Sequence, residues 1–196
     1  MSKLDQKLST LDPVWGQIRK EAEEAVVAEP LLGGLIHSTL LHHDTLEAAL
    51  AYRVSMKLAS AEMSEQILRE IADHVYENDA DIGQSSRADL MAIYERDPAC
   101  HRLLQPILYF KGFQAVQAFR IGHSLWNAGR KDMAYFFQMR VSEVFGVDIH
   151  PAATIGRGLM IDHAHSIVIG ETARVGDNVS MLHSVTLGGT GKEDHI

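Results

Sequence analysis

The sequence has one cysteine, few basic residues and no long apolar run. Cys100 stands alone, so an intramolecular disulfide is excluded, and we expect a reducing, cytoplasmic location. No uninterrupted apolar stretch approaches the roughly 18 to 20 residues that a membrane-spanning helix needs. The polar amino terminus carries no visible secretory signal. We therefore expect no membrane association.

Positive charge is also scarce. Lys and Arg number 18 against 26 Asp and Glu, which gives a formal net charge of −8. A chain with this balance is a poor ligand for a phosphate backbone, so nucleic acid is not expected as a partner. With 196 residues, 46% of them hydrophobic and 22% charged, the composition is typical of a folded globular protein of one or two domains.

Glycine is unevenly distributed along the chain. Eight of the 15 glycines lie in residues 146–196, and the other seven lie in the preceding 145 residues. This change predicts two domains. We expect residues 1–145 to form an α-helical domain and residues 146–196 to form a β domain.

The first part has the capping and spacing signals of helices. Asp12, followed by a proline, predicts a helix start, and Asp44 begins a four-residue stretch with capping-box spacing. Ser86 predicts the start of a further helix. Residues 100–127 are apolar at helical spacing, and Gly129 offers a stop. We predict an all-α bundle for this part.

The second part has a period of six instead of 3.6. Steps of six meet aliphatic residues throughout: Ile149, Ile155, Ile161, Ile167, Ala173, Val179 and Val185. Aliphatic-glycine pairs at 169–170 and 175–176 repeat at another phase. Such a repeat predicts a parallel β-helix, whose coils of 18 residues would place Asp148 beneath Ser166. The alternative is a chance spacing within a loop-rich β domain.

Six strings, in order along the chain, extend this pattern to a known family. They are Glu95-Arg-Asp-Pro-Ala-Cys100, Tyr109-Phe-Lys-Gly-Phe113, Asp148-Ile-His-Pro-Ala-Ala153, Asp162-His-Ala164, Ile169-Gly-Glu-Thr172 and Val185-Thr-Leu-Gly-Gly-Thr-Gly-Lys192. With them the chain resembles the serine acetyltransferases. The hexapeptide repeat alone indicates only the broader acyltransferase superfamily. The resemblance implies an α+β fold, in which an α-helical domain for oligomerisation and substrate binding, residues 1–145, precedes a left-handed parallel β-helix that forms the acetyltransferase domain, residues 146–196, here apparently truncated.

The resemblance also implies a reaction and its site residues. The family transfers the acetyl group of acetyl-CoA to the hydroxyl of L-serine, giving O-acetylserine in L-cysteine biosynthesis. By the matching strings, His163 is the catalytic base and Asp148 its carboxylate partner, while Asp97 and Asp162 bind serine. The loop along the CoA arm comprises Gly188, Gly189, Thr190, Gly191 and Lys192.

The reaction needs residues of these types. A serine hydroxyl is too weak an acid to ionise at neutral pH, so a base must remove its proton during attack on the thioester. Histidine has a suitable pKa, and a carboxylate on its other ring nitrogen fixes the tautomer and stabilises the imidazolium.

Each candidate also has a structural interpretation. His163 could be a surface histidine, and Asp97 a helix cap before proline. His150 is assigned a structural hydrogen bond, and His183 is a candidate for contact with substrate or CoA. The glycines of the 188–192 loop could form an ordinary turn. The neighbours His42-His43 and Cys100-His101 lack the spacing of a metal site, so no metal is expected.

The sequence departs from the family after residue 192. The family continues there with Asp-Arg-His-Pro, whose Arg and His contact the serine carboxylate, whereas this chain reads Glu193-Asp-His-Ile196. A substrate role for His195 therefore stays open. The same residues also resemble the family's isoleucine-ended tail, which binds O-acetylserine sulfhydrylase.

The family further implies a homotrimer or a hexamer and feedback inhibition by L-cysteine. Two alternatives stay open. The chain could be a weakened form that acts in oligomerisation or sulfhydrylase binding, or an acetyltransferase for another hydroxyl acceptor such as a sugar.

Overall fold

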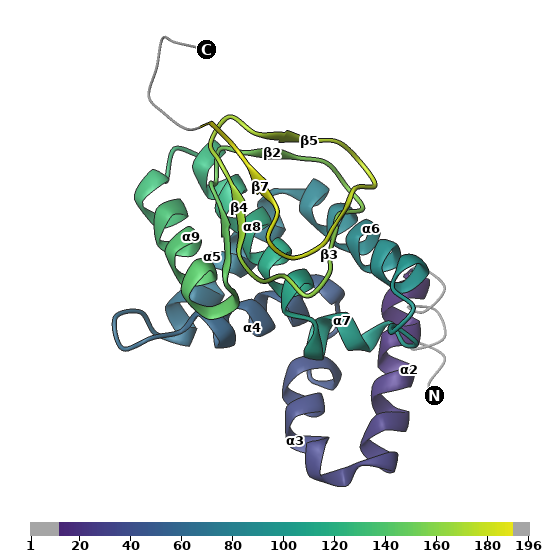
Figure 1. The fold of residues 1–196 in the computed structure, drawn as a ribbon. Coiled ribbons are helices and arrows are strands. Elements are labelled where there is room, and N and C mark those ends of the chain that lie inside the picture. Colours follow the sequence, from purple (N-terminus) through teal and green to yellow (C-terminus); the bar gives the residue numbers. More distant parts are fainter. Residues whose placement is uncertain (1–11, 190–196) are drawn as a thin grey trace.

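The computed structural model describes residues 12–189. Up to residue 145 the described chain is helical, and beyond it the chain forms short strands (Figure 1). The α-helices are α2 (Pro13–Ala28), α3 (Gly33–Ile36), α4 (Leu46–Leu58), α5 (Glu65–Asn78), α6 (Ala80–Arg96), α7 (Leu104–Tyr109), α8 (Lys111–Asn127) and α9 (Lys131–Phe145), with the 3-10 turn η1 (Pro30–Leu32) and the π-helical turn η2 (His37–Leu41) between α2 and α4.

The helix starts confirm one predicted cap and correct two. Asp12 caps α2 by accepting a hydrogen bond from the backbone N–H of Trp15 at 3.1 Å. Thr45, and not Asp44, caps α4. Ser86 does not start a helix, because it lies inside α6. Its hydroxyl donates to the carbonyl of Ile82 in the preceding turn of the same helix. The expected continuous helix over 100–127 is interrupted at Phe110, whose extended backbone separates α7 from α8.

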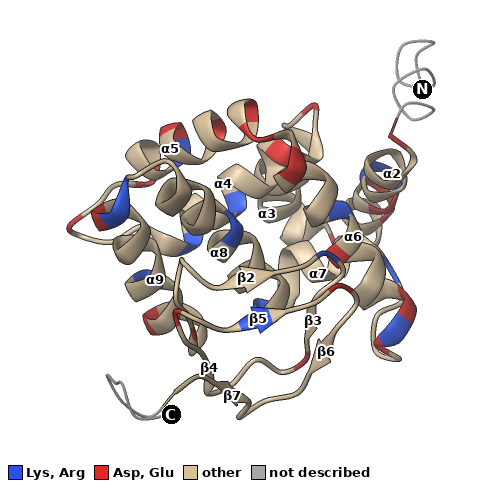
Figure 2. Ribbon diagram, turned by 90° about the horizontal axis from the view of Figure 1, so that it is seen from above, with Lys and Arg blue, Asp and Glu red and all other residues tan. Residues whose placement is uncertain are grey.

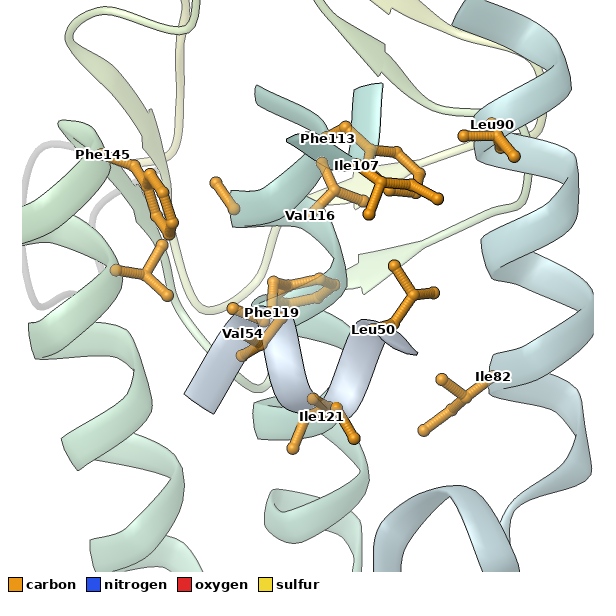
Figure 3. Close-up of a cluster of buried hydrophobic side chains, with 14 of the residues drawn as sticks. Leu50, Val54, Ile82, Leu90, Ile107, Phe113, Val116, Phe119, Ile121 and Phe145 are labelled. Carbon is orange, nitrogen blue, oxygen red and sulfur yellow. The ribbon is translucent and has the colours of Figure 1, made fainter. Parts of the chain in front are cut away.

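Helix α8 is the centre of the apolar core. Its side chains Phe113, Val116, Phe119 and Ile121 pack among residues from α4, α6 and α9 (Figure 3). Nearly every residue from Gly112 to Leu125 is buried, so α8 has no extended solvent-facing side. The helices around α8 form the base on which the strands lie.

The strands form a parallel β-helix. They are β1 (Val147–Ile149), β2 (Thr154–Ile155), β3 (Met160–Ile161), β4 (Ile167–Ile169), β5 (Arg174–Val175), β6 (Ser180–Met181) and β7 (Thr186–Leu187). Every third strand pairs in parallel, which gives the sheets β1-β4-β7, β2-β5 and β3-β6. Figure 1 shows these strands stacked coil on coil beside the helices. The predicted fold class is confirmed.

The register corrects the predicted spacing of the coils. Ile149 pairs with Ile169, Ile155 with Val175 and Ile161 with Met181, so the first coil advances by 20 residues. In the next coil Ile169 pairs with Leu187, an advance of 18. Asp148 therefore pairs with Val168 and not with Ser166. The second coil follows the phase of the aliphatic-glycine pairs at 169–170 and 175–176.

A buried ion pair joins the helices to the first coil. Asp89 of α6 accepts from Nε and Nη2 of Arg120 in α8 at 2.7 and 2.8 Å, and neither side chain is more than 7% exposed. Asp89 also accepts from the backbone N–H of Leu159, while Arg120 donates to the carbonyl of Gly156. These bonds fix the turn between β2 and β3 on the helical base.

Charge is concentrated on the helices. Figure 2 shows most Lys, Arg, Asp and Glu on the helical part, whereas the coils are mainly uncharged. Within residues 12–189 no helix is both long and apolar enough to cross a membrane.

Candidate active site

A cleft of about 460 Å³ lies where the helical part meets strand β3. Three segments line it: the end of α6 with Asp97, the junction of α7 and α8, and the chain from β3 to His163. Strand β3 lies against α6 and α8 (Figure 1). The cleft brings together three of the predicted site residues, Asp97, Asp162 and His163, although 65 residues separate the first two.

Hydrogen bonds of Asp97 and of its neighbour Arg96 fix the end of α6 at the cleft. It follows the last residue of α6, and its carboxylate Oδ1 accepts from the backbone N–H of Ala99 at 2.8 Å. The preceding residue, Arg96, donates to the carbonyl of Asn178 at 3.1 Å and to its side-chain oxygen at 3.0 Å. The end of α6 is therefore attached to the second coil. Asp97 does cap the helix end, as its structural interpretation requires, and it also lines the cleft.

His163 lies in a corner of the first coil, residues 162–166, which we call the long corner. The chain takes eight residues from Ile161 to Ile169 but six from Met181 to Leu187, so this corner holds the two extra residues of the first coil. His163, Ala164 and Ser166 have positive φ angles of 58°, 50° and 54°. Non-glycine residues adopt this conformation only where their surroundings enforce it.

The His163 side chain is 68% exposed and has few neighbours. Its Nε2 lies 3.6 Å from Oδ2 of Asp162, and its ring centroid lies 6.2 Å from that of His183, in an edge-to-face arrangement. Because so little side-chain packing holds the imidazole, its position depends mainly on the backbone of the long corner, which sets the direction of the Cα–Cβ bond.

Asp148 lies on β1, outside the residues that line the cleft. Its Oδ1 accepts from the side-chain amide of Gln138 in α9 at 2.7 Å. Within the described residues no hydrogen bond joins Asp148 to His163. The pairing of these two side chains stays a prediction.

The predicted CoA loop is only partly within the described residues. Gly188 and Gly189 follow β7, and a Cβ placed on Gly188 would make an ordinary contact of 3.6 Å with the backbone of Gly170 in the coil before it. Thr190, Gly191 and Lys192 lie outside the described residues, as do His195 and Ile196.

Two further histidines, His150 and His43, have structural contacts. His150 accepts from the backbone N–H of Ala152 at Nδ1, and its ring lies edge-on to Trp126 and Tyr135. His43 contacts the carbonyl of Ser38, and burial lowers the pKa of its imidazole. Among residues 12–189 no group of three or more His, Cys, Asp or Glu side chains is arranged to hold a metal ion.

Two cleft residues were present in the sequence strings without an assigned role. Gly112 packs against Ala164 and the backbone of Ile161, and Lys111 beside it reaches the long corner. The Tyr109–Phe113 string was the sequence feature that contained both residues. Their role depends on the close contact between α8 and the β-helix, which cannot be predicted from a local pattern.

The fold and the cleft together define a class. Helices pack on a parallel β-helix with a six-residue aliphatic period, and a histidine lies beside two carboxylates where they meet. This combination defines a hexapeptide-repeat acyltransferase.

Comparison with known proteins identifies the family within this class. The family described as "Serine acetyltransferase, N-terminal" matches residues 14–118. The serine acetyltransferase of Salmonella typhimurium is 50% identical over 182 residues, which cover 93% of this chain and 67% of that protein. The chain belongs to the serine acetyltransferase family.

Solved structures agree with this assignment. The Neisseria gonorrhoeae serine acetyltransferase in complex with serine has a TM-score of 0.90 and 53% identity, covering 92% of this chain and 75% of that one. The Brucella abortus enzyme in complex with coenzyme A has a TM-score of 0.91 and 47% identity, covering 98% and 76%.

Proposed function

We propose that this protein transfers the acetyl group of acetyl-CoA to the hydroxyl of L-serine, giving O-acetyl-L-serine and CoA. The observation that carries the proposal is the cleft in which His163 lies with Asp97 and Asp162. Related structures contain serine and coenzyme A, the product form of the acetyl donor.

His163 acts as the general base. Its imidazole takes the hydroxyl proton as the serine oxygen attacks the thioester carbonyl, which forms a tetrahedral intermediate. Collapse of the intermediate breaks the carbon–sulfur bond, and the imidazolium returns the proton to the leaving thiolate. General-base assistance of this kind contributes about 10² to 10⁴ in rate.

The two carboxylates of the cleft orient serine. Asp97 and Asp162 supply negative charge for the serine ammonium. The ammonium donates charge-assisted hydrogen bonds to these carboxylates, and this holds the serine hydroxyl in a fixed position relative to the base. Asp162 has a second function. Its Oδ2 lies 3.6 Å from Nε2 of His163, so its carboxylate stabilises the imidazolium that forms on the base.

Asp148 is the partner of the base in this proposal. It would hold the His163 tautomer through the nitrogen that does not take the proton. Its bond to Gln138 supports a fixed carboxylate on β1.

The acetyl donor lies along the end of the β-helix. We propose that the loop of residues 188–192 follows the CoA arm, because glycines permit close approach of the backbone. His183, edge-on to the His163 ring, would contact serine or the thioester.

The family relationship extends the proposal to assembly and control. We propose a homotrimer formed through the coils, and a hexamer formed through the helices. The outward apolar side chains Val168 and Leu182, 43% and 58% exposed, support a contact between coils. L-cysteine, which resembles serine, would compete for the same cleft, and the product would enter L-cysteine biosynthesis through O-acetylserine sulfhydrylase.

The test follows loss of the thioester when the protein is mixed with acetyl-CoA and L-serine. We expect turnover with serine and less with a sugar offered at the same concentration. Preference for the sugar would favour another hydroxyl acceptor. No turnover, together with sulfhydrylase binding that is lost on deletion of Ile196, would favour the weakened form.

A further inference from the structure

The long corner, residues 162–166, has a conformation that its own sequence does not favour. Three of its five residues have positive φ without being glycine, whereas the matching corner of the second coil has one, Ser184. Contacts with the rest of the molecule must therefore hold the long corner in place.

The contacts come from several segments. Ala164 is fully buried against Gly112 at the start of α8. The carbonyl of His165 accepts from the backbone N–H of Ser184 at 2.8 Å, in the next coil. The third contact is made by a charged side chain, Lys111.

Lys111 connects three elements through one nitrogen. Its Nζ donates to the carbonyl of Phe145, the last residue of α9, at 3.1 Å and lies 3.0 Å from Nδ1 of His165. An ammonium has no acceptor, so His165 accepts through Nδ1 and carries its proton on Nε2. The amine is thus fixed between a helix end and the long corner.

The position of Lys111 in its helix is otherwise unfavourable. It is the first residue of α8, where the helix dipole repels a positive charge. The side chain is instead directed to the carboxyl end of α9, where the dipole attracts it. The charge of Lys111 does not stabilise its own helix. Its stabilising contribution comes from the hydrogen bonds to Phe145 and His165.

We propose that Lys111 is a positioning residue, which fixes the long corner through His165 and Phe145 and so directs His163 toward serine. The inference rests on the proposed function, in which His163 is the base. His163 is held by its backbone and by few side-chain contacts, so a shift of the corner moves the imidazole directly. Misplacement of a catalytic group by about 1 Å can cost 10²-fold in rate.

The test compares both ends of the contact. Lys111→Met and His165→Ala should each lower kcat about ten- to hundredfold with the KM for serine within about twofold. The double variant should be no slower than the slower single variant, because both remove one interaction. Lys111→Arg, which can donate to both acceptors, should restore most of the rate. Lys20→Met, in an exposed pair with Glu24, is the matched control.

Hydrogen exchange of the amides of residues 163–167 supplies a measurement independent of activity. Exchange should be faster in Lys111→Met and His165→Ala, and unchanged in Lys20→Met. His165→Ala keeps the inference testable if Lys111→Met fails to fold.

Three outcomes would overturn the inference. Unchanged exchange and unchanged kcat in both variants would show that the contact holds nothing. A raised KM for serine in Lys111→Met alone, with normal kinetics in His165→Ala, would assign Lys111 to direct substrate contact. Faster exchange without loss of kcat would separate the corner from catalysis. If the unaltered protein fails to consume the thioester, the proposed function fails, and exchange alone decides whether Lys111 holds the corner.

Discussion

A Cβ atom placed on Gly112 would overlap the carbonyl oxygen of Ile161, so α8 and β3 meet with no room for a side chain between them. The same atom would lie 3.1 Å from the Cβ of Ala164 in the long corner. This contact sets the depth at which the corner, with His163, lies on the helical base.

Gly112→Ala is therefore expected to destabilise the protein. The methyl group meets backbone, which cannot rotate away, and overpacking of this kind costs about 1–3 kcal/mol. Urea unfolding measures the loss. The control is Gly122→Ala in the same helix, where the new Cβ would have an ordinary contact of 3.5 Å with Phe137 and should be tolerated. Equal stability of the two variants would contradict the close contact.

Asp89→Ala should be among the most damaging single changes. It leaves Arg120 buried without a carboxylate and frees the N–H of Leu159, at an expected cost of about 3–5 kcal/mol. The exposed pair of Arg157 with Asp81 is the control, and Asp81→Ala should cost less than about 1 kcal/mol. If both changes cost the same in urea unfolding, the helices and the first coil are not joined as described.

Asp12 should contribute to stability in a pH-dependent way. Burial by itself raises the pKa of this carboxyl, but hydrogen bonds from Arg87 and Trp15 outweigh it, so the pKa is lowered from 3.8. A lowered folded pKa means stability that is present above pH 3.8 and lost as pH falls through the lower folded value.

Asp12→Asn isolates this charge, because asparagine is also a good helix cap. We expect the variant to be less stable than the unaltered protein at pH 7, with the difference in free energy of unfolding shrinking as the pH is lowered below 3.8. Asp132→Asn, in the first turn of α9, is the comparison. A difference that is independent of pH would exclude the charge as its source.

Asp97→Asn should act on serine and not on the acetyl donor. The variant keeps the oxygen that accepts from Ala99 but loses the charge that we propose faces the serine ammonium. Loss of a hydrogen bond to a charged group costs about 1.5–3 kcal/mol, so the KM for serine should rise roughly ten- to hundredfold. Initial-rate kinetics with both substrates measures this. An equal rise in the KM for acetyl-CoA would count against the assignment.

Much of this architecture could be predicted from local sequence. The cap at Asp12 and the six-residue period depend on residues close together, and both appear in the structure. The helix start predicted at Ser86 was wrong because Ser86 is buried within α6, as is Asp89, which meets Arg120 from a distant helix. No local pattern reports such a partner.

The long corner marks the limit in the site itself. Two additional residues between Ile161 and Ile169 shift the aliphatic phase, and a constant step of six passes over them because Ile167 also fits the step. The cleft residues Asp97 and His163 came from family strings, since the distance between them depends on how α6 packs on β3.

The central claim is that His163 is the base of serine acetylation, and comparison of His163→Ala with His150→Ala tests it most directly. Both variants lose an imidazole near the start of the β-helix, but only His163 lines the cleft. With saturating acetyl-CoA and L-serine, kcat should fall about 10²- to 10⁴-fold in His163→Ala, while His150→Ala keeps its turnover. Turnover in folded His163→Ala at the rate of the unaltered protein would contradict the account.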